Sequence, residues 1–185
     1  MERQLIRRAR AGDQAAFGQL VERHAAVAWR VARVLSADAS SAEDAVQEAW
    51  LDAWRGLPRF DDARPFRPWL LTLVANRCRK APRRPPWPAL DDATLALLAA
   101  ADDGLGAVLR EETAGEVRAT LAALPGAQRR VLELRFFAGL DLAEIALVLG
   151  TPLGTVKSRL HRALAAARSR WLAGRAAALV TEEER

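Results

Sequence analysis

The sequence predicts an all-α protein made of two small helical domains that a proline-rich, flexible linker joins. Half of the 185 residues are hydrophobic, tyrosine is absent, and the abundant Ala, Leu and Arg favour helix over strand. Residues 81–90 contain four prolines, which a helix interior does not tolerate. We therefore expect one domain at residues 1–80, a linker at 81–106, a second domain at 107–172 and a short tail at 173–185.

Two helices are expected before residue 36. Residues 5–10 form a short charged helix that ends near Gly12, and Asp13 can cap the helix that follows. Apolar side chains then recur at helical spacing at Phe17, Leu20, Val21, His24, Val27, Ala28, Val31 and Leu35. His24 lies on this stripe with no second ligand nearby, so we interpret it as a core or boundary residue and not as a metal ligand.

After a connection at residues 36–41, a helix with one strongly acidic side is expected to run from Ser41 to about Leu57. Its apolar side holds Ala45, Ala49, Trp50, Ala53 and Trp54, and its polar side holds Glu43, Asp44, Gln47, Glu48 and Asp52. The polar side could be a solvated face, a binding surface, or paired carboxylates for acid–base catalysis. Catalytic carboxylates usually need a cleft and a shifted pKa, and nothing in this pattern indicates a cleft.

A loop at residues 58–68 follows, marked by three prolines and an Asp-Asp pair. It interleaves aromatic residues with arginines at Arg59, Phe60, Arg64, Phe66 and Arg67, a pattern typical of stacking on unpaired bases. A structured turn with its aromatics packed underneath is an equally good interpretation. The next helix, residues 69–80, ends in Asn76, Arg77, Arg79 and Lys80, and cations at a helix C-terminus are favourable in any case.

The second domain is expected to contain about four helices. A short helix at 94–100 could precede it, and helices are expected at 108–124 and from Pro125 to Gly139. Asp141 and Glu144 have the spacing of a capping box that opens the next helix, and Gly150 suits the position just after its end. Thr151 and Pro152 can then start a further helix.

This last helix has a buried stripe and a basic face. Val156, Leu160, Ala163, Leu164 and Ala167 form the stripe, and Lys157, Ser158, His161, Arg162 and Arg168 form the face. Residues 145–181 contain six Lys or Arg and no acid, so this face can bind phosphates through counterion release. Two helices with a tight turn, the second of them basic, indicate a DNA-binding helix-turn-helix. A helical hairpin with a solvated basic face is the simpler alternative.

The overall composition points in the same direction. The net charge is +5 and the isoelectric point is about 10.7, which suits an anionic partner. Cys78 is the only cysteine, so there is no disulfide framework and no CxxC metal site, and we expect neither a metal nor a cofactor. The N-terminus lacks the apolar core of a signal peptide, and no stretch reaches 18 apolar residues. We expect a cytoplasmic protein without membrane insertion.

Three stretches in this order resemble the extracytoplasmic-function (ECF) group of bacterial RNA polymerase sigma factors. SAEDAVQEAWLDAW at 41–54 is similar to the helix of the family that binds the core polymerase. FRPWLLTLVANRCRK at 66–80 resembles its −10 element helix, and residues 124–168 resemble its −35 element domain. The resemblance implies that residues 1–80 are sigma region 2, that residues 107–172 are sigma region 4, and that the chain directs promoter-specific transcription initiation.

The resemblance also implies roles for individual residues. The residues that would contact core RNA polymerase, through the clamp helices of its β′ subunit and its β subunit, are Glu43, Asp44, Gln47, Glu48, Trp50 and Leu51. Those that would contact the −10 element are Arg59, Phe60, Asp61, Arg64, Arg67, Asn76, Arg77 and Lys80. Those that would contact the −35 element are Thr155, Lys157, Ser158, Arg159, His161 and Arg162. An anti-sigma protein that covers these surfaces is a further implied partner.

Two other functions compete with this one. A stand-alone helix-turn-helix regulator with an N-terminal effector domain explains the second domain equally well, but it leaves the basic helix and aromatic loop of the first domain without a purpose. A metal-dependent hydrolase or nuclease could use Glu43, Asp44 and Glu48. Carboxylates along one exposed helix face do not enclose a metal ion, so the sequence favours a protein with no catalytic site of its own.

Overall fold

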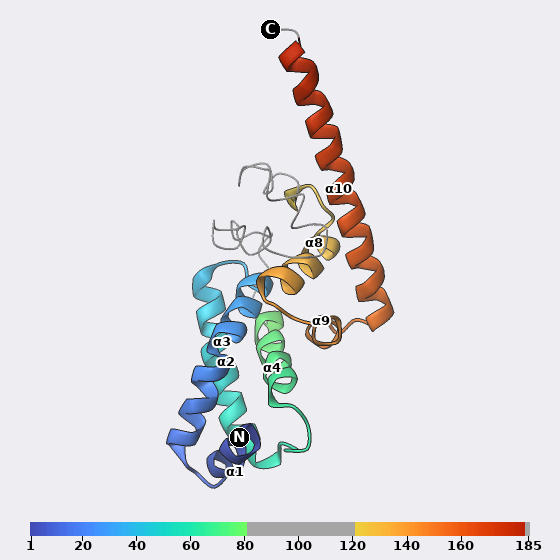
Figure 1. Cartoon of the computed structure of the whole chain (residues 1–185). Coiled ribbons are helices and arrows are strands. Elements are labelled where there is room, and N and C mark those ends of the chain that lie inside the picture. Colours follow the sequence, from blue (N-terminus) through green and yellow to red (C-terminus); the bar gives the residue numbers. More distant parts are fainter. Residues whose placement is uncertain (81–120, 184–185) are drawn as a thin grey trace. The chain divides into compact units, whose positions relative to one another are not determined.

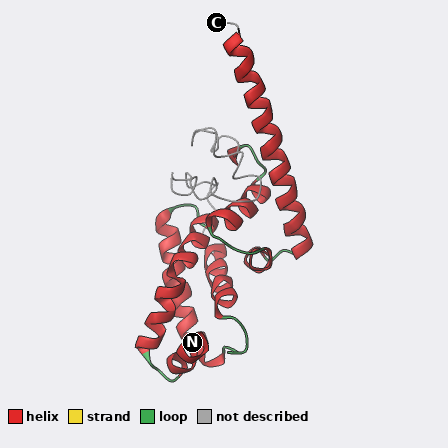
Figure 2. Ribbon diagram, viewed as in Figure 1, coloured by secondary structure: helices red, strands yellow, loops and turns green. Residues whose placement is uncertain are grey.

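The computed structural model of the chain describes residues 1–80 and 121–183, and these residues form helices and turns without a strand (Figure 2). The prediction of an all-α fold is confirmed. The linker expected at 81–106, the short helix at 94–100 and most of the helix at 108–124 lie outside the described residues. The described helices belong to two units, and each unit is considered by itself.

The N-terminal unit is a bundle of three helices with a fourth, shorter helix at one end (Figure 1). Its elements are α1 (Glu2–Arg10), α2 (Gln14–Leu35), α3 (Ala39–Gly56), the 3-10 turn η1 (Leu57–Arg59) and α4 (Phe66–Lys80). The helices α2, α3 and α4 contact one another pairwise, and α1 packs on α2. The buried side of α3 consists of four alanines, Ala42, Ala45, Ala49 and Ala53. Small side chains let this helix approach its neighbours closely, which brings its polar residues to the outer side of the bundle.

Local capping decides where these helices begin. Asp13 caps α2 as expected, because its side chain accepts a hydrogen bond from the Ala16 amide at 3.0 Å. The expected start of α3 at Ser41 is wrong, since Asp38 caps that helix by accepting from the Ser41 amide at 2.7 Å. The helix α4 likewise begins at Phe66 and not at Trp69. Pro68 falls in its first turn, where a backbone N–H has no partner to lose.

His24 is a buried residue of the bundle, as the sequence predicts. Its side chain is 8% exposed, and its Nε2 lies 2.6 Å from Oε1 of Glu2 on α1. The imidazole ring also lies 5.4 Å from the ring of Phe66, centre to centre. His24 therefore connects α1 and the start of α4 to the long helix α2, and this contact sets where α1 lies.

The C-terminal unit contains α8 (Gly126–Leu132), the π-helical turn η2 (Glu133–Phe137), α9 (Leu142–Leu149) and α10 (Leu153–Glu183). The helices α8 and α10 contact each other. The single helix expected from Pro125 to Gly139 is thus an α-helix that widens into a π-turn. The helix α10 runs through most of the tail expected at 173–185, because this alanine-rich stretch has no proline to end it.

None of the helices that the structure describes is long and apolar enough to cross a membrane. Within residues 1–80 and 121–183, no three His, Cys, Asp or Glu side chains come together in a way that could hold a metal ion.

Candidate functional site

The turn between α9 and α10 has the geometry that its sequence predicts. The Asp141 Oδ1 accepts from the Glu144 amide at 2.8 Å, and the Asp141 amide donates to Glu144 Oε2 at 3.0 Å. This reciprocal pair is the expected capping box, and it opens α9. After α9, Gly150 adopts a φ of 61°, which a residue with a Cβ occupies only with strain. These two local features fix the direction in which α10 leaves the turn.

The helix α10 presents a polar face opposite its buried stripe. Val156, Ala163 and Ala167 are buried. The residues predicted for the −35 element are exposed at Lys157, Ser158, His161 and Arg162, and half-buried at Thr155 and Arg159. The Arg162 guanidinium folds back along the helix, because its Nε donates to the Ser158 carbonyl at 3.2 Å and its Nη2 to the Ser158 hydroxyl at 3.3 Å. An exposed arginine with two parallel donors is the group that pairs with guanine in a major groove.

The acidic residues of α3 form an exposed row on the outside of the N-terminal bundle. Glu43, Asp44, Gln47 and Glu48 are all exposed. The buried alanines of α3 lie on its other side, so this row is available to a partner. Among the described residues, an arginine pairs with this row at Glu48, whose Oε2 lies 3.2 Å from Nη1 of Arg77.

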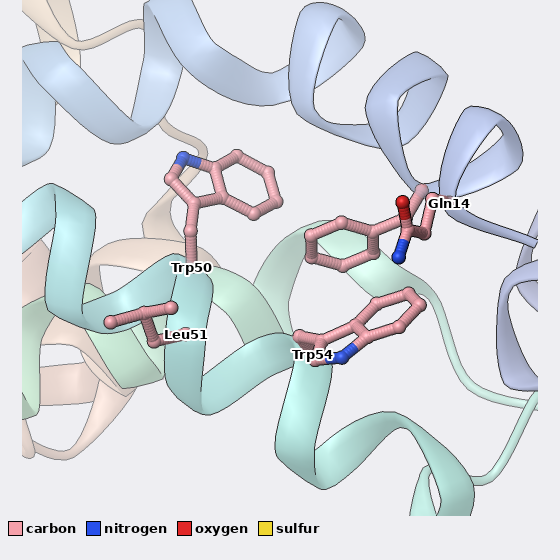
Figure 3. Close-up of a pocket in the computed structure, with 5 residues that line it drawn as sticks. Gln14, Trp50, Leu51 and Trp54 are labelled. Carbon is pink, nitrogen blue, oxygen red and sulfur yellow. The ribbon is translucent and has the colours of Figure 1, made fainter. Parts of the chain in front are cut away.

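An apolar pocket of about 210 Å³ lies between the first turn of α2 and the second half of α3. Figure 3 shows Trp50, Leu51 and Trp54 on α3 and Gln14 on α2 around it. The ring of Phe17 completes the wall, with its centre 5.9 Å from that of Trp50 and 4.9 Å from that of Trp54. Trp50 and Leu51 were predicted to contact a partner. The roles of Phe17 and Trp54 were missed, because their meeting depends on how α2 packs against α3.

The loop between η1 and α4 is built on a cluster of buried aromatic rings. Phe60 is 7% exposed, and its ring centre lies 5.8 Å from that of Phe66 and 4.6 Å from that of Trp69. The ring of Phe60 thus faces the protein in this structure, and its predicted contact with DNA stays a prediction. The alternative interpretation, a structured turn with its aromatics packed underneath, describes this loop correctly.

The polar residues of the same loop remain exposed. Arg59, Asp61 and Arg64 all face solvent. Asp61 organises the turn: its Oδ1 accepts from the Ala63 amide and its carbonyl from the Arg64 amide, both at 3.0 Å. Arg67 is half-buried in the first turn of α4. Asn76 is exposed about 15 Å further along that helix, and its side chain accepts from Arg79 at 2.7 Å.

Arg77 has a structural partner in place of the predicted DNA contact. Its guanidinium donates to both carboxylate oxygens of Asp52 on α3 and is only 24% exposed. The hydrogen bond with Asp52 raises the pKa of Arg77 further. In this structure the Arg77 side chain connects α4 to α3, and its predicted contact with DNA stays a prediction. Lys80 ends α4, and its side chain lies outside the described residues.

The first helix contributes contacts to the loop that sequence reasoning missed. The Arg7 Nε on α1 donates to Asp62 Oδ2 at 2.8 Å, and Arg10 Nη2 donates to the Phe60 carbonyl. The hydrogen bond from Arg7 holds the pKa of the Asp62 carboxyl below its usual range. Arginines at residues 7 and 10 share a helix face, but nothing in the sequence indicates a partner more than fifty residues away.

Two family models match the chain, one in each unit. Residues 20–85 match sigma-70 region 2, and residues 114–166 match sigma-70 region 4. The first of these segments contains the acidic row, the loop and α4. The second contains the helix-turn-helix.

Similar proteins cover almost the whole chain. The RNA polymerase sigma factor NccH of Alcaligenes xylosoxydans xylosoxydans is 34% identical over 166 residues, which cover 87% of this chain and 89% of that protein. The ECF RNA polymerase sigma factor SigL of Mycobacterium tuberculosis is 37% identical over 170 residues, with coverages of 86% and 91%.

A solved structure of CnrH in complex with the cytosolic domain of CnrY is also similar. It is 29% identical with a TM-score of 0.63, and the match covers 93% of this chain and 97% of that one. Together with the two region models and the similar sequences, this likeness shows that the chain belongs to the ECF family of RNA polymerase sigma factors.

Proposed function

We propose that this sigma factor gives core RNA polymerase its promoter specificity through three surfaces. The acidic row of α3 binds the core enzyme, the loop before α4 together with α4 binds the −10 element, and α10 binds the −35 element. The chain carries no catalytic site in this proposal and acts in the cytoplasm, where the polymerase and the DNA are. The observation that carries the proposal is the exposed acidic row beside an apolar pocket, because acidic and apolar side chains together suit a protein partner and not DNA.

The surface for the core enzyme combines charge with an apolar anchor point. Glu43, Asp44, Gln47 and Glu48 supply an exposed polar and acidic row. The pocket beside Trp50 and Leu51 offers a concave apolar site next to that row. An acidic surface that meets a basic one gives orientation and a fast association rate, while buried aromatic contacts supply most of the affinity. We propose that basic and apolar side chains of the β′ clamp helices and the β subunit occupy this surface.

For the −10 element we propose a smaller surface than the full set of residues expected from the sequence. Phe60 and Arg77 are committed to packing and to an internal ion pair. Arg59, Asp61 and Arg64 in the loop, with Arg67 and Asn76 on α4, remain as the proposed contacts, and Lys80 is proposed on its sequence alone. Exposed arginines around a rigid turn suit a base that has left the duplex, together with its neighbouring phosphates.

The surface for the −35 element is the exposed face of α10. Lys157, Ser158, His161 and Arg162 lie where a recognition helix meets base edges. Thr155 and Arg159 are half-buried at the edge of this face and are proposed to contact phosphates, which position the helix without specifying sequence.

A protein inhibitor is a further proposed partner. CnrH, which is similar along nearly all of this chain, has been solved in complex with the cytosolic domain of CnrY. An exposed apolar pocket beside a charged row is a surface that an inhibitor could cover, and covering it would keep the core enzyme away. We propose that an anti-sigma protein binds the N-terminal unit in this way.

The test uses the full chain with purified core RNA polymerase. Asp44→Arg reverses one charge in the acidic row, and we expect on the order of tenfold weaker binding to the core enzyme. Glu22→Arg is the matched control. Glu22 is exposed on α2 about 140° around the helix from Phe17, so it points away from the pocket and the proposed surface. Binding of both variants to the core enzyme is measured by fluorescence anisotropy, and promoter-dependent run-off transcription follows.

The two variants distinguish the outcomes. Loss with Asp44→Arg and retention with Glu22→Arg supports the proposed surface. Equal binding by Asp44→Arg and the wild-type chain contradicts it. A wild-type chain that does not bind the core enzyme at all contradicts the whole proposal and favours a stand-alone regulator.

A further inference from the structure

The first helix of the chain contacts the loop proposed to capture the −10 base. The helix α1 precedes residue 20, where the match to sigma-70 region 2 begins. It nevertheless lies at the end of the bundle where the loop before α4 is found (Figure 1). Its apolar side, Leu5, Ile6 and Ala9, is buried. The opposite side carries arginines.

Two of these arginines form hydrogen bonds with residues of the loop. Arg7 donates from Nε to Oδ2 of Asp62 at 2.8 Å, and Arg10 donates to the backbone carbonyl of Phe60. Phe60 and Asp62 flank Asp61, which shapes the turn that presents Arg64. Arg10 therefore contacts the loop backbone directly before Asp61, and Arg7 contacts the side chain directly after it.

The same arginines balance the negative charge of the loop. Asp61 and Asp62 lie side by side in a segment proposed to approach DNA, where two carboxylates would repel phosphates. Arg7, Arg10 and Arg3 all act on the Asp62 carboxyl and favour its ionised, paired form. With Asp62 paired, the field that DNA meets is set by the exposed Arg59 and by Arg64, whose Nε lies 3.5 Å from Oδ2 of Asp61.

We propose that Arg7 and Arg10 are positioning residues for −10 recognition, which hold the loop at residues 60–65 in its base-accepting shape and neutralise Asp62. The inference rests on the proposed role of that loop. Neither arginine needs to touch DNA. Their effect is pre-organisation: a loop already ordered before binding loses less conformational entropy when it captures a base.

The contacts are suited to this role because they contribute little to the stability of the bundle. The Arg7 side chain is 71% exposed and that of Asp62 is 25% exposed. Exposed ion pairs hardly affect global unfolding. Phe60 stays packed against Phe66 and Trp69 without them, so their removal frees the outer part of the loop and leaves the fold in place.

The test compares three arginines of one helix in the full chain, assembled with core RNA polymerase. Arg7→Ala and Arg10→Ala remove the contacts to the loop. Arg8→Ala is the matched control, since Arg8 pairs with Asp13 at 2.7 Å and does not contact the loop. The probe is a pool of promoter fragments randomised at the −10 positions, selected by open-complex formation and sequenced. Core binding and the thermal unfolding midpoint are measured for every variant.

We expect Arg7→Ala and Arg10→Ala each to lower open-complex formation roughly threefold to tenfold, with a flatter base preference at the −10 positions. Core binding, the −35 preference and the unfolding midpoint stay at wild-type values. An equal loss with Arg8→Ala would overturn the inference, because the effect would then belong to α1 as a whole. An unchanged −10 preference in both loop variants would overturn it as well.

An exchange of charges between Arg7 and Asp62 distinguishes a positioning role of Arg7 from a direct contact of Arg7 with DNA. The double variant Arg7→Asp with Asp62→Arg restores the ion pair with its ends reversed, and we expect it to recover most of the base preference that either single variant loses. No recovery would mean that Arg7 itself contacts DNA. The same assays would also reveal a wild-type chain that does not bind the core enzyme. That outcome would contradict the proposed function and not this inference.

Discussion

The two surfaces of this sigma factor that we propose to face DNA are built in different ways. The proposed recognition helix α10 follows the capping box of α9 and the left-handed Gly150, all within twelve residues of its start. The loop before α4 is shaped by partners far away in the chain. Arg7 lies 55 residues from Asp62, and Arg10 lies 50 residues from Phe60.

This difference predicts how each surface responds to amino-acid substitutions. A locally built surface changes only when its own segment changes, so its variants should affect DNA readout without involving other helices. A surface assembled from distant parts depends on residues that never approach DNA. Asp52 is one of these, since it fixes α4 through Arg77.

The largest expected effect among variants of the recognition helix is that of Arg162→Ala. Loss of one bidentate base contact should cost about 1–3 kcal/mol of discrimination at one or two base pairs of the −35 element. Binding of the full chain in holoenzyme to a −35 library measures this discrimination. Arg168→Ala is the control on the same exposed side, and a uniform, sequence-independent loss is expected for it. A uniform loss with Arg162→Ala as well would make Arg162 a phosphate contact.

Two glycines near the start of α10 allow a matched pair of alanine substitutions that should change the free energy of unfolding in different directions. Gly150→Ala places a Cβ at a φ of 61°, and we expect about 1–2 kcal/mol of lost stability. Gly154→Ala lies four residues later inside α10 with open space around it, and it should be neutral or stabilise by up to about 1 kcal/mol. Chemical denaturation of both variants checks the pair. Destabilisation by both substitutions would show that the steric room for the added Cβ, and not the backbone conformation of Gly150, limits which residues this turn accepts.

The smallest expected effect tests the surface that is assembled from distant parts. Asp52→Asn leaves Arg77 without its main carboxylate, so we expect a lower melting temperature and a modest loss of −10 binding, each smaller than the effects above. Glu48→Gln is the control for stability, because Glu48 is more exposed and contacts Arg77 at a longer distance. Wild-type −10 binding by Asp52→Asn would show that the position of α4 does not depend on this ion pair.

The sequence predicted the helices and the locally built surface well. Caps at Asp13 and Asp141, the glycine after α9 and the exposed face of α10 were all read from neighbouring residues, and the structure has each of them. The acidic row of α3 was also predicted as an exposed face, because helical periodicity alone separates it from the buried alanines.

The structure differs from the expected contacts at side chains that can bind either DNA or protein. Phe60 looks like a base-stacking residue among arginines, but it packs against Phe66 and Trp69. Arg77 looks like a phosphate contact at a basic helix end, but it pairs with Asp52. An aromatic ring or a guanidinium can bind DNA or protein with similar energy, so residue type and spacing do not decide between these partners.

By itself the sequence determined the helical class, the order of the two DNA-facing surfaces and the form of the helix-turn-helix, because caps, periodicity and left-handed glycines act over one or two turns of chain. Only the tertiary structure decided that Phe60 and Arg77 have partners within the protein, which residues line the pocket beside Trp50 and Trp54, and that α1 contacts the loop. These features depend on contacts across the bundle, and such contacts exist only once the helices have packed.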